Sequence, residues 1–223
     1  MQFKESTFQF LNQLSENNNR DWFAEHKSEF DAVQKEVKQF YKAVQEQLEQ
    51  HDEIEKHKFF RIYRDVRFSK DKTPYKTHFA GSFSRNGAHL RGGYYLRLKS
   101  GESFLAGGFW EPNKDDLFRI RKEIEIDAAE FREILADPEF QKYFGDKFEG
   151  EELKTAPKGF DKTHPDIDLI RKKGYIAVRN FTDKEVLSKN FLQEIDKSYQ
   201  ALRPFFDLMS SVLTTNLNGE SLL

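Results

Sequence analysis

The stretch THFAGSFSRNGAHLRGGYYLRLKSGESFLAGGFW, residues 77–110, decides the fold of this chain. It contains three segments rich in apolar and aromatic residues: THFAGSFS, YYLRL and SFLAGGFW. Turn signals separate these segments at Asn86-Gly87 and at Ser100-Gly101. Because connections this short join antiparallel neighbours, the stretch predicts an antiparallel meander.

Two further strands are predicted on either side of the meander. From residue 58 the sequence alternates, and the apolar side chains on one face would be Phe60, Ile62, Val66 and Phe68. The polar face would carry Arg61, Tyr63, Asp65 and Arg67. Arg64 interrupts the apolar face. GYIAVRNF, residues 174–181, predicts a late strand.

Helical periodicity precedes the strands. Phe8, Leu11 and Leu14 predict a short helix that ends at the turn-forming residues 16–19. Apolar residues at steps of three and four then predict one long helix from Trp22 to Leu48, with His26 in its stripe.

Helical signals return after Trp110. N-terminal caps are predicted at Asn113, Asp127 and Asp137. Thr163 with Asp166 would open a short helix closed by Gly174, and Thr182 with Glu185 would cap a final long helix that Pro204 kinks.

These elements predict an α+β fold. A central, mostly antiparallel sheet, from about residues 59–110 and 174–181, would pack with long helices from both ends of the chain. Glycine and proline are not gathered into a linker, so a single domain is expected over residues 1–215, with a flexible tail at 216–223.

Composition excludes several classes of protein. The 223 residues include 23 Phe and carry a net charge of −2, which favours a packed core and excludes a chain that is basic throughout. With no cysteine there is no disulfide, thiolate nucleophile or cysteine zinc site. No apolar run approaches the length of a membrane span or a signal peptide, so the expected location is the cytoplasm, without membrane contact.

One segment departs from this near-neutral balance. Residues 56–78 contain eight Lys and Arg against two Asp, a local charge of +6 in a chain of −2. Arginine offers a planar fork for carboxylate or phosphate, and lysine a compact mobile charge. The sequence therefore predicts an anion-binding site whose cations are Arg61, Arg64, Arg67, Lys72 and Lys76.

The expected ligand is a phosphate- or carboxylate-bearing small molecule, and an enzyme acting on it is one form of this hypothesis. Asp65 would orient an arginine, or act as a base if its surroundings raised its pKa, and His78 is a second candidate catalytic residue. The alternatives are a solvated strand face, a docking site for an acidic protein, and a nucleic-acid-binding module with Tyr63 or Tyr75 stacked on bases.

Two other segments carry weaker signals. His164, Asp166 and Asp168 could be taken for metal ligands, but they would have to converge from one short segment, so no metal site is predicted. Gly107-Gly108 lacks phosphate-loop spacing and favours close packing, and Trp110 is expected in the core. No cofactor is indicated.

Four blocks of the sequence resemble one known family. They are NNNRDWFAEHKSEFD (17–31), FRIYRDVRFSKDKTPYKTHFAGSFSR (60–85), GGFWEP (107–112) and LKTAPKGFDKTHPDIDLIRKKGY (153–175). In this order they resemble family 2461 of the domains of unknown function, over nearly the whole chain. The resemblance implies a single soluble domain and supplies no activity, substrate or catalytic residue.

Overall fold

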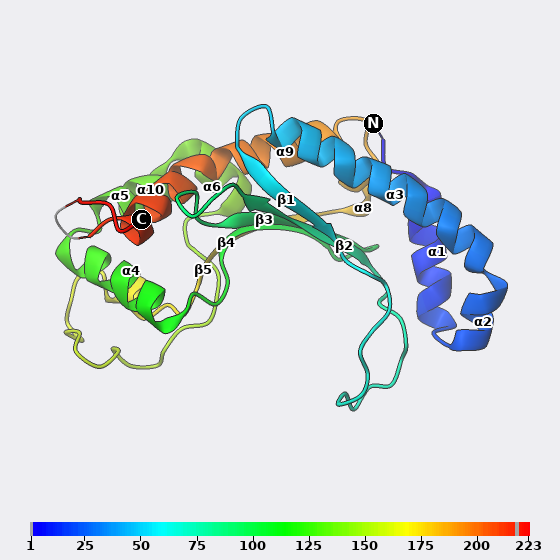
Figure 1. Cartoon of the computed structure of the whole chain (residues 1–223), viewed down its shortest axis with the longest axis horizontal. Helices are drawn as coiled ribbons and strands as arrows, with labels where there is room; N and C mark the ends of the chain where they lie inside the picture. Colours follow the sequence, from blue (N-terminus) through cyan, green and yellow to red (C-terminus); the bar gives the residue numbers. More distant parts are fainter. Residues whose placement is uncertain (1, 217–218) are drawn as a thin grey trace. The chain divides into compact units, whose positions relative to one another are not determined.

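The computed structural model describes residues 2–216 and 219–223. Its sheet has five strands, and strands that follow one another in the chain are neighbours in the sheet (Figure 1). The strands are β1 (Ile54–Phe59), β2 (Phe79–Arg85), β3 (Gly93–Leu98), β4 (Ser103–Phe109) and β5 (Tyr175–Phe181). The sheet is antiparallel and the fold is α+β, so the predicted class and the meander are confirmed.

The chain forms two compact units. Unit 1 comprises Met1–Phe83, Tyr95–Leu105 and Asn180–Lys197, and unit 2 comprises Ser84–Tyr94, Ala106–Arg179 and Ser198–Leu223. Strands β2 to β5 each contribute residues to both units. That one domain spans residues 1–215 stays a prediction.

Helix α3 (Lys27–Leu48) covers one face of the strands in unit 1 (Figure 1). The buried Tyr41 of this helix donates a hydrogen bond from its hydroxyl to the Leu96 carbonyl oxygen at 2.9 Å. A Cβ atom on Gly81 would lie 2.7 Å from the Tyr41 ring, so only glycine lets the helix approach this closely. Leu96, Leu98 and Leu105 are fully buried.

The long N-terminal helix predicted from Trp22 is wrong. The segment forms two helices, α2 (Arg20–Glu25) and α3, after a first helix α1 (Glu5–Glu16). Residue His26 separates them, and its ring stacks on Trp22 with ring centroids 4.0 Å apart. The separate α2 buries Phe23, whose ring stacks on Tyr75 at 4.0 Å, whereas Trp22 is only half-buried. Because Phe23 and Tyr75 are far apart in the sequence, local periodicity could not predict this contact.

The final long helix is also divided. Thr182 and Glu185 form the predicted capping box, but the helix that they open, α8 (Asp183–Val186), is short. Helices α9 (Phe191–Ala201) and α10 (Arg203–Thr214) follow. Leu202 separates them, and Pro204 lies in the first turn of α10, where its missing amide costs the helix no hydrogen bond. The chain thus begins a new helix near Pro204, in place of the kink predicted within one long helix.

Unit 2 contains helices α4 (Lys114–Ile126), α5 (Ala129–Ala136), α6 (Pro138–Phe144) and α7 (Ile167–Ile170). The caps predicted at Asn113 and Asp137 are confirmed, since their side chains accept hydrogen bonds from the first-turn amides. Asp166 does not cap α7 with its side chain, because Arg132 takes one of its carboxylate oxygens instead.

The paired glycines of β4 serve packing, as predicted. A Cβ atom on Gly107 would lie 2.4 Å from Leu202, and one on Gly108 would lie 2.2 Å from the Tyr175 carbonyl oxygen. Gly108 also has φ +135°, a conformation that other residues rarely adopt. Trp110 is 72% exposed, so its predicted place in the core is wrong: the strand ends at Phe109, and residue 110 projects beyond the pairing.

The C-terminal residues fold back on α10. Of the predicted tail, residues 217 and 218 lie outside the described residues. Thr215 and Ser221 form an antiparallel bridge, and the Leu222 amide donates to the Thr214 carbonyl oxygen at 2.8 Å. Across residues 2–216 and 219–223, no helix combines the length and apolar character needed to cross a bilayer.

Candidate functional site

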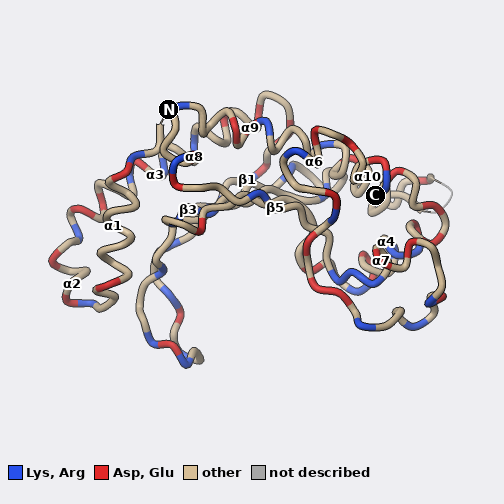
Figure 2. Tube along the Cα trace, turned by 180° about the vertical axis from the view of Figure 1, so that it is seen from behind, with Lys and Arg blue, Asp and Glu red and all other residues tan. Residues whose placement is uncertain are grey.

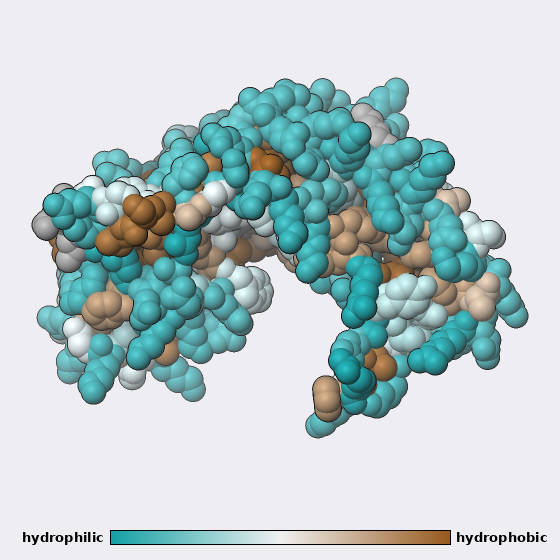
Figure 3. Space-filling model, viewed as in Figure 1, coloured by the Kyte–Doolittle hydropathy of each residue, from teal (hydrophilic) through white to brown (hydrophobic). Residues whose placement is uncertain are grey.

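Most of the basic segment lies in a loop. The strand predicted from residue 58 to 68 is wrong: β1 ends at Phe59, and residues 60–78, here called the basic loop, connect β1 to β2. Blue and red segments alternate along this loop in Figure 2, and Figure 3 shows its surface as mostly hydrophilic. Ile62 is buried, but Phe68, expected on the same apolar face, is 96% exposed.

Local hydrogen bonds explain why the alternation does not produce a strand. Asp65 accepts from the Arg67 amide at 3.3 Å, and Asp71 accepts from the Thr73 amide at 3.0 Å. These side-chain contacts occupy backbone N–H groups that hydrogen bonds between strands would need, and Pro74 has no backbone N–H to donate. Pairing within the loop is therefore limited to the bridge between Tyr63 and Tyr75.

Arg64 is held by an acid of its own loop. Its Nη1 donates to Asp71 Oδ2 at 2.6 Å and to the Thr73 carbonyl oxygen at 3.0 Å. Hydrogen bonds from Thr73 and then from Arg64 lower the pKa of Asp71 to about 2. The partner that Arg64 requires is thus Asp71, and its contacts close the loop.

Arg67 and Asp65 form a second pair. Arg67 Nε donates to Asp65 Oδ1 at 3.0 Å and Nη2 to Oδ2 at 2.7 Å, a two-pronged contact. These hydrogen bonds lower the pKa of Asp65, which is the opposite of what a catalytic base would need. Lys72 is tied as well, since its Nζ donates to the Val66 carbonyl oxygen at 2.9 Å.

Arg61 and Lys76 differ from these three cations. Within residues 2–216 and 219–223, neither side chain forms a hydrogen bond or an ion pair with an acid. Burial, and then the charge of Arg61, lowers the pKa of the half-buried Lys76. The two positive charges are therefore close enough to repel each other, and no acid among the described residues is bonded to either of them. Asp65, which binds Arg67, acts on Arg61 only through space.

His78 lies within the same positive field. Burial, and then the charges of Arg97, Lys76 and Lys99, lower its pKa to about 4 against a smaller opposite effect of Glu102. The imidazole is accordingly neutral at pH 7, with one ring nitrogen that can donate a hydrogen bond and one that can accept.

The face of the unit 1 strands opposite α3 collects aromatic and basic side chains. Phe60 and Tyr95 have ring centroids 6.3 Å apart, and Tyr95 and Phe104 are 5.6 Å apart. Lys58 Nζ and Lys76 Nζ lie 5.4 and 5.7 Å from the centre of the Phe60 ring. We call this surface the basic sheet face; its residues are Lys58, Phe60, Arg61, Lys76, His78, Tyr95, Arg97, Lys99 and Phe104.

Sequence reasoning missed six members of this face as site residues: Lys58, Phe60, Tyr95, Arg97, Lys99 and Phe104. The signal that could have found Tyr95 and Arg97 is the alternation in YYLRL, because Leu96 and Leu98 are buried while the residues between them are not. Tyr75 is not available for the base stacking considered above, since it is 7% exposed and its ring lies on Phe23.

A family model described as "Conserved hypothetical protein (DUF2461)" matches residues 6–208. The chain belongs to the DUF2461 family. No curated protein and no solved structure shows a match to this sequence. The part that matches the DUF2461 model includes the basic loop, the basic sheet face and the first half of α10.

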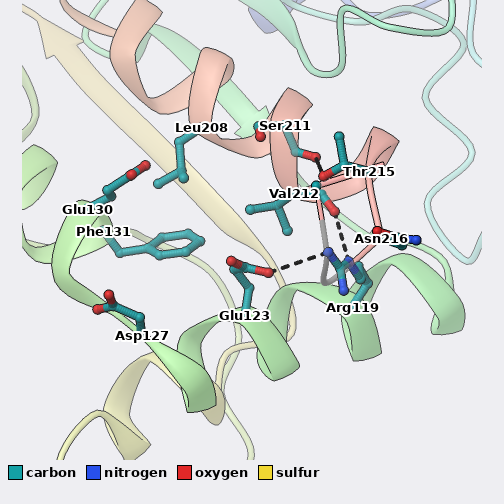
Figure 4. A pocket seen from close by; sticks show the side chains of 11 residues that line it. Arg119, Glu123, Asp127, Glu130, Phe131, Leu208, Ser211, Val212, Thr215 and Asn216 are labelled. Carbon is teal, nitrogen blue, oxygen red and sulfur yellow. Dashed lines mark hydrogen bonds and ion pairs between the residues drawn. The ribbon is translucent and has the colours of Figure 1, made fainter. Parts of the chain in front are cut away.

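Unit 2 of this DUF2461 protein contains a pocket of different character. It encloses about 290 Å³ beside α4, α5 and α10 (Figure 4). Among the described residues that line it, Arg119 is the one with a basic side chain. Its Nε donates to the Val212 carbonyl oxygen at 3.0 Å, and its Nη2 lies 3.5 Å from Glu123 Oε2. Asp127 and Glu130 complete an acidic lining that does not suit an anion.

The residues considered as metal ligands are used otherwise. Arg132 binds Asp166 at 2.8 Å through Nε and Asp168 at 2.6 Å through Nη2, and the His164 ring accepts from the Asp166 amide at 3.1 Å. In the part of the chain that the structure describes, no three His, Asp or Glu side chains are grouped as metal ligands.

Proposed function

We propose that unit 1 binds a phosphate- or carboxylate-bearing molecule at Arg61 and Lys76. The observation that carries this proposal is the pair of neighbouring cations that no acid among the described residues binds, Arg61 and Lys76. Lys76 also lies near the half-buried His78, whose pKa it lowers together with burial, Arg97 and Lys99. Like charges close together at a half-buried position raise the free energy of the unliganded protein. A bound anion would remove this repulsion.

The remaining cations of the loop have a supporting role in this proposal. Arg64, Arg67 and Lys72 are engaged by Asp71, Asp65 and backbone carbonyls, so they maintain the loop from which Arg61 and Lys76 extend. Neutral His78 would donate one ring N–H to the anion. Its role would be hydrogen bonding, and any proton transfer by His78 would start from the neutral ring.

Histidine titration by NMR, with and without inorganic phosphate, tests the proposal. An anion bound beside His78 favours its protonated form, so phosphate should raise its pKa from about 4. Arg61→Gln and Lys76→Gln should each weaken the response at least about fivefold. Arg67→Gln is the matched control, because Arg67 lies in the same loop but already binds Asp65.

Two results would overturn the proposal. One is a His78 pKa that phosphate leaves unchanged at concentrations up to tens of millimolar. The other is an equal loss of response in Arg67→Gln and in Lys76→Gln, which would show only the general effect of net charge.

A further inference from the structure

The three aromatic rings of the basic sheet face form a row. Phe60 comes from the start of the basic loop, Tyr95 from β3 and Phe104 from β4, with neighbouring ring centroids 6.3 and 5.6 Å apart. All three side chains are partly exposed, although phenylalanine is usually buried. Antiparallel strands with aromatic residues on their uncovered face are a recurrent surface for stacking unpaired bases.

Cations stand beside this row, at the end where the loop begins. Lys58 and Lys76 place their amino groups near the Phe60 ring, at 5.4 and 5.7 Å from its centre, and Arg61 lies close enough for its charge to act on Lys76. None of the three cations has an acid as partner within the described ranges 2–216 and 219–223. A base stacked on Phe60 would therefore carry its phosphate to cations that no acid binds.

The surface distinguishes between forms of nucleic acid. A duplex keeps its bases paired and stacked within the helix, so it can offer only its backbone to this face. A free phosphate would use the cations but leave the rings uncovered. A single strand uses both, because each unpaired base has a face for stacking and each nucleotide a phosphate.

We propose that the ligand of this face is single-stranded nucleic acid, whose bases stack on Phe60, Tyr95 and Phe104 and whose phosphates contact Lys58, Arg61 and Lys76. This inference rests on the anion site proposed above and specifies its ligand. Because the net charge of the chain is −2, binding depends on this local surface.

Fluorescence anisotropy with labelled 12-nucleotide probes tests the proposal, using oligothymidylate, oligouridylate and a mixed-sequence DNA duplex of equal length. At least one single strand should bind at least about tenfold more tightly than the duplex. Three phosphate contacts predict that log K falls with log salt at a slope of about −2. Phe104→Leu and Phe60→Leu, which keep apolar volume but remove a ring, should weaken binding about 5- to 100-fold.

Phe68→Leu is the matched control, because Phe68 is a highly exposed ring at the far end of the loop. The Phe68→Leu variant should bind single strands as tightly as the unmodified chain does. Arg61→Gln tests the same surface without touching the packed rings, and should make the salt slope shallower by about 0.7.

The outcomes separate this inference from the proposed function. If phosphate shifts the His78 pKa but single strands bind no better than the duplex, the anion site stands and the nucleic-acid ligand is overturned. The same holds if Phe104→Leu and Phe60→Leu bind as tightly as Phe68→Leu. If phosphate has no effect on His78 and no probe binds, both proposals fail.

Discussion

Three arginines of unit 2 and two cations of the basic loop in unit 1 differ in their partners. In unit 2, Arg132 binds two aspartates, Arg91 binds Asp116, and Arg85 reaches Asp207 with its side chain fully buried. In unit 1, Arg61 and Lys76 have no acid among the described residues. Residue type alone does not separate the cations that acids bind from those that no acid binds. Charge without a partner is the feature that distinguishes a candidate binding site from a structural contact.

The largest expected effect concerns Arg85, an arginine of unit 2 that makes structural contacts. Arg85 donates to Asp207 at 3.1 Å and to the Arg91 carbonyl oxygen at 3.1 Å. Arg85→Ala would leave a cavity and would remove the donor to the part-buried Arg91 carbonyl, so it should lower the free energy of unfolding by about 3 kcal/mol. Urea denaturation followed by circular dichroism measures this change.

Arg61→Ala is the matched control for Arg85→Ala. Because Arg61 is exposed and no described residue bonds to its side chain, its loss should change the free energy of unfolding by less than about 0.5 kcal/mol. Equal destabilisation by the two substitutions would remove the distinction between a structural and an available arginine.

A smaller effect is expected at His78. Its pKa is about 4 in the folded chain against 6.5 ordinarily, so between these values the unfolded chain binds more protons. The free energy of unfolding should therefore fall as pH drops from 6.5 toward 4, with no further loss from this group below that. Urea midpoints at pH 7 and pH 4.5 measure the fall, and His78→Gln should reduce it.

Two comparisons sharpen the His78 result. His89→Gln, a substitution of an exposed histidine, should leave the fall between pH 7 and pH 4.5 unchanged. Phosphate at saturating concentration should reduce the fall, because an anion beside the ring raises its pKa. If the free energy of unfolding falls as much in the His78→Gln variant as in the unmodified chain, a group other than His78 causes the fall.

The meander and the late strand could be predicted because their determinants are local. Gly101 has φ +72° at the β3–β4 turn, as the Ser100-Gly101 dipeptide suggested, and alternation fixes which side chains face α3. The basic loop could not be predicted in this way. Its alternation matches a strand, but Asp65 and Asp71 bind nearby amides, and no local pattern reveals that choice.

The sequence predicted the type of residue in the candidate site, but not which residues form it. Local charge pointed to five cations of the loop, including Arg61 and Lys76. Which of them lack an acid depends on the path of the loop, since Asp71 reaches back seven residues to Arg64. Phe104 belongs to the basic sheet face because β4 pairs with β3. The sequence alone does not show that this pairing brings Phe104 to the same face as Phe60.

The smallest expected effect concerns Asp71, and it decides whether Arg64 belongs with the structural or the available cations. Because hydrogen bonds from Thr73 and Arg64 lower the pKa of Asp71 to about 2, its contribution to loop order is present above pH 3.8 and lost as pH falls through about 2. The Thr73 amide shift in NMR spectra should titrate at that lower value, and Asp71→Asn should abolish the titration. Since Asp71 is exposed, the urea midpoint at pH 7 should hardly change in this variant. A Thr73 midpoint near 3.8 would mean that Asp71 does not hold Arg64, so a third cation of the loop would be free to meet an anion.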